Sequence, residues 1–139
     1  MIAQVPFLED AIIPIRKLVA DGIRVCATYV YTGTQAFLAA KVGARMIIVN
    51  VNDVDGNGQR GAQVVADIRD VIDQTKIECD LVVAGVHNAQ QFTEAMLAGA
   101  DIICVTPEFL HELLVHSLTD RGVDRFLRDV SRRRKLRGG

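Results

Sequence analysis

One pattern recurs along this chain and limits the folds open to it. A stretch with helical spacing of apolar residues ends in a glycine, and after one spacer residue a short β-branched apolar run follows. The pattern occurs three times, with Gly22 before residues 24–30, Gly43 before residues 45–51 and Gly99 before residues 101–105. Glycine readily takes the left-handed conformation that ends many helices. Because the apolar runs are continuous rather than alternating, they are typical of parallel strands covered on both faces, and we expect an α/β protein.

The remaining segments extend this order to about five strand and helix units. Two further strands are predicted, at residues 2–5 and 79–86. Helical spacing predicts helices at residues 9–20, 34–42, 61–74, 89–98, 108–116 and 122–132. The first must begin near Ala11, because Pro14 in a helix interior would cost about 3 kcal/mol. A length of 139 residues suits a single domain. We therefore expect one domain over residues 1–130 and a basic C-terminal tail over residues 131–139.

Repeated βα crossovers form either an open, doubly wound sheet or an arc of a β/α barrel, and periodicity does not choose between them. A complete eight-stranded barrel needs about 200 residues or more, so five units would form only an arc. An arc leaves two unpaired strand edges and an exposed apolar face, which invite pairing with another chain. We therefore expect a homo-oligomer, or a partner chain that completes the barrel.

Charge and cysteine content limit the partners and the compartment. The formal net charge is −1, so the whole molecule has no field that would attract nucleic acid or an anionic membrane, and neither partner is expected. Cys26, Cys79 and Cys104 lie in apolar runs and form no C-x-x-C pair, so we expect three buried free thiols. The chain shows no signal-like start and no apolar run of roughly 18 residues. These features favour a cytoplasmic protein.

Three segments resemble the transaldolase and fructose-6-phosphate aldolase family, in particular its small microbial members. Residues 28–44 look like the family stretch T-L-V-F-S-x-x-Q-A-x-x-A-A-x-A-G-A, residues 95–102 like A-x-x-A-G-A-D-I, and residues 116–126 like H-P-L-T-D-x-G-x-x-x-F. The resemblance extends from Gln4 to about Val130. It implies carbohydrate metabolism, on sugar phosphates of the pentose phosphate type. It also implies a partial TIM-type (β/α) barrel, with about five parallel strands equivalent to strands 4–8 and helices outside.

The same resemblance implies that the family's covalent chemistry is lost. In these enzymes a lysine on the fourth strand, in a V-x-K-V-P context, forms a Schiff base with a keto sugar. Residues 2–6 occupy that place, so Gln4 stands at the lysine position, and a carboxamide forms no imine. Thr28 matches a family threonine that helps to position a catalytic water. The resemblance therefore implies little or no Schiff-base aldolase activity of this chain alone, and it calls for no cofactor.

The family's phosphate-binding residues are also replaced. An arginine after the sixth strand falls on Asp53, and the S-x-R/K at the end of the seventh falls on residues 85–87, with Gly85 and His87 at its ends. An aspartate and a mostly neutral histidine would repel a sugar phosphate rather than bind it. These replacements imply a different ligand, or none. A binding site, with a sugar or sugar phosphate as the possible ligand, is predicted at the C-terminal mouth, where barrel active sites lie. Its predicted residues are Asn50, Asn52, Asp53, Gly85 and His87.

Several interpretations stay open at this point. Residues 53–58 imitate the opening of an EF-hand calcium loop, yet Val64 stands at the twelfth position, so a βα turn is favoured and no metal site is predicted. His87 is either an acid, base or ligand, or a strand-end histidine bonded to nearby backbone. Besides an inactive transaldolase relative, two functions remain. One is altered aldol chemistry by Asp53, Asp55 and His87 in an assembled barrel, and the other is a non-catalytic oligomerising or regulatory subunit.

Overall fold

The computed structural model describes the backbone of residues 1–137 and the side chains of residues 1–133. The chain divides into two compact units, Met1–Val105 (unit 1) and Thr106–Gly139 (unit 2). The division expected from the sequence, a domain over residues 1–130 and a tail over residues 131–139, stays a prediction.

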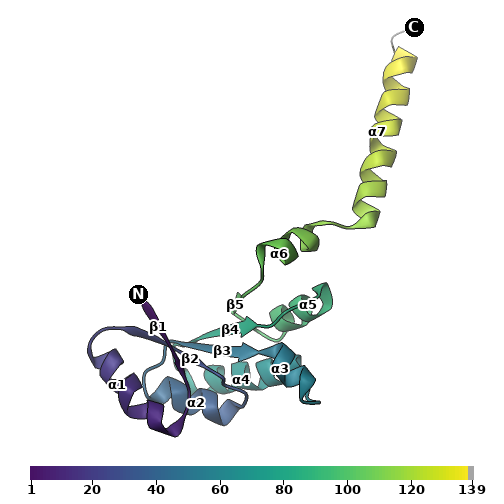
Figure 1. The fold of residues 1–139 in the computed structure, drawn as a ribbon. Helices are drawn as coiled ribbons and strands as arrows, with labels where there is room; N and C mark the ends of the chain where they lie inside the picture. Colours follow the sequence, from purple (N-terminus) through teal and green to yellow (C-terminus); the bar gives the residue numbers. More distant parts are fainter. Residues whose placement is uncertain (138–139) are drawn as a thin grey trace. The chain divides into compact units, whose positions relative to one another are not determined.

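A single sheet of five parallel strands forms the centre of unit 1 (Figure 1). The strands are β1 (Ile2–Pro6), β2 (Arg24–Thr28), β3 (Met46–Asn50), β4 (Asp80–Ala84) and β5 (Ile102–Ile103). They lie in the sheet in the order β1-β2-β3-β4-β5, each beside its predecessor in the chain. A doubly wound sheet reverses its strand order at a switch point, and this sheet does not. The order therefore decides between the two architectures, and unit 1 is an arc of a β/α barrel.

Helices connect the strands much as the sequence predicts. Unit 1 contains the 3₁₀ turn η1 (Glu9–Ala11) and the helices α1 (Ile12–Ala20), α2 (Gly33–Lys41), α3 (Val51–Gly56), α4 (Gly61–Thr75) and α5 (Ala89–Leu97). Pro14 is the third residue of α1, where backbone N–H groups have no intrahelical partner, so it is tolerated as expected. Gly22, Gly43 and Gly99 have φ of 75°, 110° and 94°, which confirms the left-handed helix ends that the repeat predicted.

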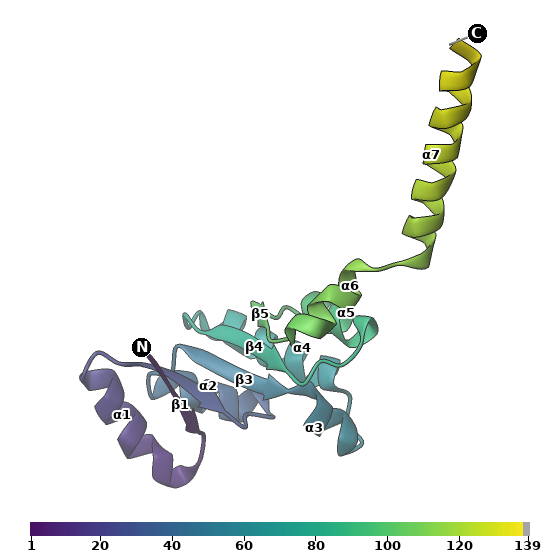
Figure 2. The ribbon, with the colours of Figure 1, turned by 45° about the horizontal axis from the view of Figure 1, so that its top comes forward.

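Helix α3 is the main departure from the expected secondary structure. Residues 53–58 were expected to form a turn, but β3 runs directly into α3 (Figure 2). The Asn50 side-chain oxygen accepts hydrogen bonds from the backbone N–H groups of Asn52 and Asp53, at 3.1 and 3.4 Å. Such a cap satisfies free N–H groups of the first helical turn. A helix therefore begins where the strand ends, and strand periodicity carries no sign of it.

The two faces of the sheet differ in how well they are covered. Strand alternation and the register place one set of side chains toward the helices. This set is completely buried and consists of Val25, Ala27, Ile47, Val49, Leu81 and Val83, all 0% exposed. We call the opposite side the open face; it carries Ile2, Gln4, Cys26, Thr28, Met46, Ile48, Asn50, Val82, Ala84 and Ile102. Its edges are exposed, with Ile2 at 40% and Ile102 at 39%, whereas Cys26 and Val82 in its middle are buried. The core of unit 1 therefore lies between the sheet and its helices.

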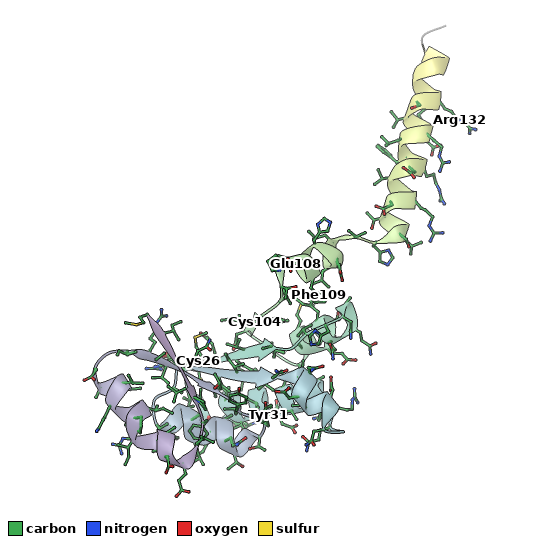
Figure 3. The ribbon with its side chains drawn as sticks, in the orientation of Figure 1. Cys26, Tyr31, Cys104, Glu108, Phe109 and Arg132 are labelled. Carbon is green, nitrogen blue, oxygen red and sulfur yellow. The ribbon has the colours of Figure 1, made fainter. Side chains whose placement is uncertain are left out.

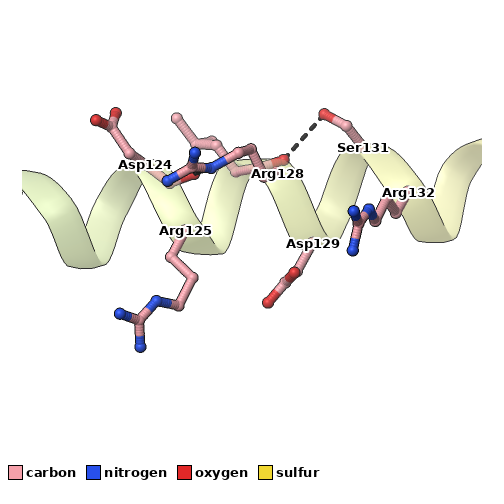
Figure 4. A pocket seen from close by; sticks show the side chains of 7 residues that line it. Asp124, Arg125, Arg128, Asp129, Ser131 and Arg132 are labelled. Atoms are coloured by element: carbon pink, nitrogen blue, oxygen red, sulfur yellow. Dashed lines mark hydrogen bonds between the residues drawn. The ribbon is translucent and has the colours of Figure 1, made fainter.

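Unit 2 consists of α6 (Pro107–Leu114) and α7 (Ser117–Arg137). Helix α7 replaces the predicted helix at residues 122–132 with a longer one. Its described side chains alternate between acidic, basic and apolar types, and Ser131 Oγ donates a hydrogen bond to the Leu127 carbonyl at 2.9 Å (Figure 4). Most of the basic run expected near the C-terminus lies outside the described side chains. Within the described residues, each helix is too short or too polar to cross a bilayer.

The three cysteines are free, but only two of them are buried. Burial raises the pKa of Cys26 to about 11 and that of Cys79 to about 12. The prediction of a buried thiol is wrong for Cys104, which is exposed. It directly follows β5, which has only two residues and forms an edge of the sheet. At such an edge, no further strand shields the side chain in unit 1.

Thiol reactivity is expected to separate these cysteines. Because the thiolate is the reactive form, the native chain at pH 8 should react with Ellman's reagent rapidly at one cysteine and at least ten-fold more slowly at two. Stopped-flow absorbance measures both phases. Cys104→Ser should remove the fast phase, whereas Cys26→Ser should leave it intact. Three equal rates in the native chain would contradict the burial of Cys26 and Cys79.

Candidate functional site

The carboxyl ends of the strands bring several predicted residues to one edge of unit 1. The register pairs Pro6 with Thr28 and Asn50 with Ala84, the last residues of β1 to β4. Gly85 follows Ala84 directly, and His87 lies two residues beyond it and is exposed. Barrel enzymes place their active sites at this edge. Asn50 and Gly85 lie against one another, and Thr28 ends the neighbouring strand β2 at the same edge. We call these three the strand-end cluster.

Gln4 lies on the open face, two residues before the end of β1 and paired with Cys26 in the register. It is exposed, because β1 forms an edge of the sheet. Lys17 and Lys41 are in helices α1 and α2, and Lys76 caps the end of α4. The Lys135 side chain lies outside the described residues. Among the lysines of unit 1, therefore, all belong to helices or helix ends rather than to the strands.

Gly85 and Asn50 lie very close together within the strand-end cluster. Gly85 has φ of +74°, and a Cβ added to it would lie 2.0 Å from the Asn50 side-chain oxygen. This oxygen caps α3, so the close approach joins the exit of β4 to the first turn of that helix. Only glycine fits such a position without strain. Gly85 therefore has a structural role, and its predicted contact with a ligand stays a prediction.

The two aspartates of α3 accept hydrogen bonds from different parts of unit 1. Asp53 Oδ2 accepts from the Tyr31 hydroxyl at 2.8 Å. Asp55 Oδ1 accepts from the Gly61 backbone N–H at 2.7 Å, and its Oδ2 accepts from Gln91 Nε2 at 3.0 Å. These separate contacts and the helical backbone rule out the EF-hand conformation for residues 53–58. In the described part of the chain, no group of three His, Cys, Asp or Glu side chains is arranged to hold a metal ion.

Gln91 links the predicted site residue His87 to this network. The backbone N–H of His87 donates to Gln91 Oε1 at 2.9 Å, while Gln91 Nε2 reaches Asp55. The loop after β4 is thereby fixed to α3. No local pattern singles out Gln91, because it is 36 residues from Asp55 and its residue type is common on helices. The bond at His87 comes from its backbone, and the residue itself is exposed.

Tyr31 is a further residue that the sequence did not single out. It lies between the start of α2 and helix α3 (Figure 3), where it borders a groove of about 570 Å³ that Thr32, Asp53, Asn57 and Gln59 also line. Burial raises the pKa of Tyr31 to about 12, and the hydrogen bond to Asp53 acts in the same direction. A phenol with this pKa is neutral and serves as a donor at physiological pH.

The raised pKa of Tyr31 predicts a loss of stability in alkali. The folded-state pKa lies above the ordinary value of 10, so the bond's contribution is complete below pH 10 and is lost as pH rises toward 12. Absorbance at 295 nm should show one of the two tyrosines ionising near pH 12, and Tyr31→Phe should remove that step. Asp53→Asn should move it toward pH 10. Two phenols that ionise together near pH 10 would contradict the geometry.

Comparisons with known proteins agree with this architecture. Residues 2–136 match the model of the family described as Transaldolase/Fructose-6-phosphate aldolase. A probable transaldolase of Thermodesulfovibrio yellowstonii is 33% identical over 135 residues, covering 97% of this chain and 63% of the relative. Another, of Sphingopyxis alaskensis, is 36% identical over 126 residues, covering 91% of this chain and 58% of the relative. The chain therefore spans about three fifths of the length of these curated relatives.

A solved structure supports the fold independently of the sequence. A mandelate oxidase variant with bound (S)-mandelic acid superimposes with a TM-score of 0.53 at 18% identity, covering 68% of this chain and 28% of the oxidase. At this identity the likeness concerns the fold alone. The match of the family model over residues 2–136, by contrast, confirms the resemblance drawn from the three motifs. This chain belongs to the transaldolase/fructose-6-phosphate aldolase family.

Proposed function

We propose that this chain is part of a transaldolase-like protein of sugar-phosphate metabolism, and that alone it has no Schiff-base aldolase activity. The observation that supports the second part is Gln4, which lies on the open face of β1. The resemblance to the family puts this residue at the place of the family's lysine. Imine formation needs a primary amine, which a carboxamide does not provide. The helical positions of Lys17, Lys41 and Lys76 support the same conclusion.

Borohydride trapping tests this proposal. The purified chain is incubated with dihydroxyacetone or fructose 6-phosphate, reduced with sodium borohydride and weighed by intact-mass spectrometry. We expect no covalent adduct, whereas the related probable transaldolase of Thermodesulfovibrio yellowstonii serves as the control for adduct formation. A stable adduct on this chain would overturn the proposal. Peptide mapping would then identify the amine, and the corresponding Lys→Arg variant would confirm it.

A second role, as an oligomerising or regulatory subunit, draws support from the open face. Its edges carry Ile2 and Ile102, each about two fifths exposed, and β1 has one unpaired side. Unpaired strand edges favour pairing with further strands. In this role a second copy or a partner chain covers the open face and completes a barrel.

Multi-angle light scattering at graded concentrations tests the association. We expect a species larger than the monomer. Ile2→Lys should shift it toward the monomer, because the lysine would place a charge on the covered face. Leu38→Lys, a change at an exposed position of α2, is the matched control and should leave the mass unchanged. A wild-type chain that stays monomeric at every concentration, alone and with candidate partners, would contradict the subunit role.

Altered aldol chemistry by Asp53, Asp55 and His87 has less support. Both oxygens of Asp55 accept hydrogen bonds within unit 1, and one oxygen of Asp53 is held by Tyr31. A carboxylate engaged in this way is less available as a base. His87 is exposed and stands apart from Asp53 in the hydrogen-bond network.

A further inference from the structure

Two grooves adjoin one another beside Tyr31, just before α2 (Figure 3). The groove of about 570 Å³, which we call the α3 groove, has α3 as one of its walls. The second, of about 490 Å³, is bounded by the first two turns of α4, and we call it the α4 groove. Tyr31, Thr32 and Gln59 line both grooves, so we treat the two as one double groove. Both volumes are typical of sites for small molecules.

The double groove differs from the sugar site predicted from the sequence. Of the residues predicted for that site, Asp53 lines the double groove, whereas Asn50, Gly85 and His87 line neither of its parts. The double groove is formed by α3 and by the segments at the starts of α2 and α4, whereas Thr28 belongs to the open face of the sheet. The two are therefore different surfaces of unit 1.

The double groove carries one positive and two negative side chains. Arg60 and Asp67 line the α4 groove, and Asp53 lines the α3 groove. Arg60 forms no ion pair within residues 1–133. Oδ2 of Asp53 accepts from the Tyr31 hydroxyl, and Oδ1 of Asp67 accepts from Gln63 Nε2, each at 2.8 Å. Within the same residues the second oxygen of each carboxylate has no hydrogen-bond partner, so both carboxylates can bind a cationic group of a ligand.

The spacing of these charges limits the ligand further. Arg60 and Asp67 are seven residues apart, so they lie on the same side of α4, about 10 Å apart along its axis. Asp53 lies in the adjoining α3 groove. A single small ion would therefore reach only one of the three charges. The rest of the lining is uncharged, and Tyr31 and Val64 offer apolar surface to a hydrocarbon chain. A small molecule that pairs with all three charges carries one anionic and two cationic groups, joined by such a chain.

We propose that the double groove binds a basic amino acid of the lysine type. In the α4 groove the ligand carboxylate pairs with Arg60, and its α-ammonium group pairs with Asp67. The methylene chain lies along the Tyr31 ring, and the side-chain ammonium group pairs with Asp53 in the α3 groove. The three protein side chains carry a net charge of −1, which the ligand charge of +1 balances. This site is separate from the sugar site and goes beyond the proposed function.

Titration of related compounds into the full-length ¹⁵N-labelled chain tests the ligand class. At pH 7, L-lysine should change the amide shifts of residues in both grooves, in particular Gly33, Asn57 and Gln59, and the shift changes give Kd. Norleucine lacks the side-chain ammonium group of lysine, and cadaverine lacks its carboxylate. Because each compound has lost one charged group, each should bind about five-fold more weakly than lysine.

Two charge-removing variants should act on different parts of the ligand. Asp53→Asn should weaken the binding of lysine about five-fold and leave that of norleucine unchanged. Arg60→Gln should weaken lysine and norleucine alike and leave cadaverine unchanged. Asp70→Asn and Arg16→Gln are the matched controls, because they remove exposed charges outside both grooves and should leave every Kd as it is. All four positions are exposed, so the variants should stay folded, which their amide spectra check.

The other outcomes count against the inference in different ways. Equal Kd values for lysine, norleucine and cadaverine would show that the ligand class is wrong. If lysine binds but its largest shift changes lie outside both grooves, or if folded Asp53→Asn and Arg60→Gln bind it as tightly as the wild type, the site is wrong. If lysine changes no amide shift, the double groove does not bind it, and the inference fails. The borohydride experiment is independent of these results, so the proposed function is decided separately.

Discussion

Gly85→Ala should lower the free energy of unfolding of unit 1 by about 3 kcal/mol, since it adds left-handed strain to the loss of a helix cap. The added methyl group would lie 2.0 Å from the Asn50 side-chain oxygen, so Asn50 must move away from the N–H groups of Asn52 and Asp53. Urea unfolding followed by far-UV circular dichroism measures the change. Helix α3 should also lose protection from hydrogen exchange, because its first turn is no longer capped.

Gly58→Ala provides the matched control for this experiment. Gly58 has φ of +78°, close to that of Gly85, but a Cβ there would meet no atom within 4 Å. Gly58→Ala should therefore lower the free energy of unfolding only through backbone strain, by about 1 kcal/mol. In a chain that also carries Asn50→Gly, Gly85→Ala should destabilise unit 1 by little more than Gly58→Ala does, because the clashing Asn50 side chain is absent. Equal costs for Gly85→Ala and Gly58→Ala would show that the contact with Asn50 does not matter.

Leu81→Ala should also lower the free energy of unfolding of unit 1, because it leaves a cavity in the core. Leu81 lies on β4, on the helix-covered face of the sheet, and is 0% exposed. Truncation to alanine removes buried methyl groups and leaves a cavity, which typically costs about 3 kcal/mol. The backbone N–H of Leu81 keeps its bond to Asp101 Oδ2 at 2.7 Å, so the change isolates the packing. Thermal and urea unfolding measure the loss.

Leu38→Ala is the control for the packing prediction. Leu38 is 47% exposed on α2, and its truncation should cost less than 1 kcal/mol. Comparable losses at both positions would mean that the helix-covered face is not the core of unit 1. Small domains are stable by only about 5–15 kcal/mol. A loss near 3 kcal/mol at Leu81 is therefore large enough to be seen as a clear shift of the unfolding midpoint.

The sequence predicts the features of this fold that depend on local chemistry. The glycines that end α1, α2 and α5 were identified because few other residues tolerate a left-handed helix end. The continuous apolar runs predicted all five parallel strands, although each strand is shorter or longer by a few residues than its run. Three collinear motifs identified the family. The choice between a barrel arc and a doubly wound sheet needed the strand order, which periodicity does not contain.

The candidate site was predictable only in part, because its contacts join distant segments. Thr28 and Asn50 end their strands and Gly85 follows one directly, because parallel strands end at the same edge, but the role of these residues in a site stays a prediction. The Tyr31–Asp53 bond spans 22 residues and the Gln91–Asp55 bond spans 36, so neither leaves a local sign. Helix α3 was missed because a single side-chain cap decided between turn and helix. The positive φ of Tyr29 was also hidden, because its residue type disfavours it.

The strand order has a consequence for how unit 1 is made in the cell. Each strand pairs with the one synthesised just before it, so every new β-strand and its helix can dock on a template that has already left the ribosome. Contacts between neighbours in the chain close short loops, which favours rapid folding. Joining the first strand of a closed barrel to its last requires the longest loop of all. The arc can thus assemble during translation, without a pairing between its first and last strands.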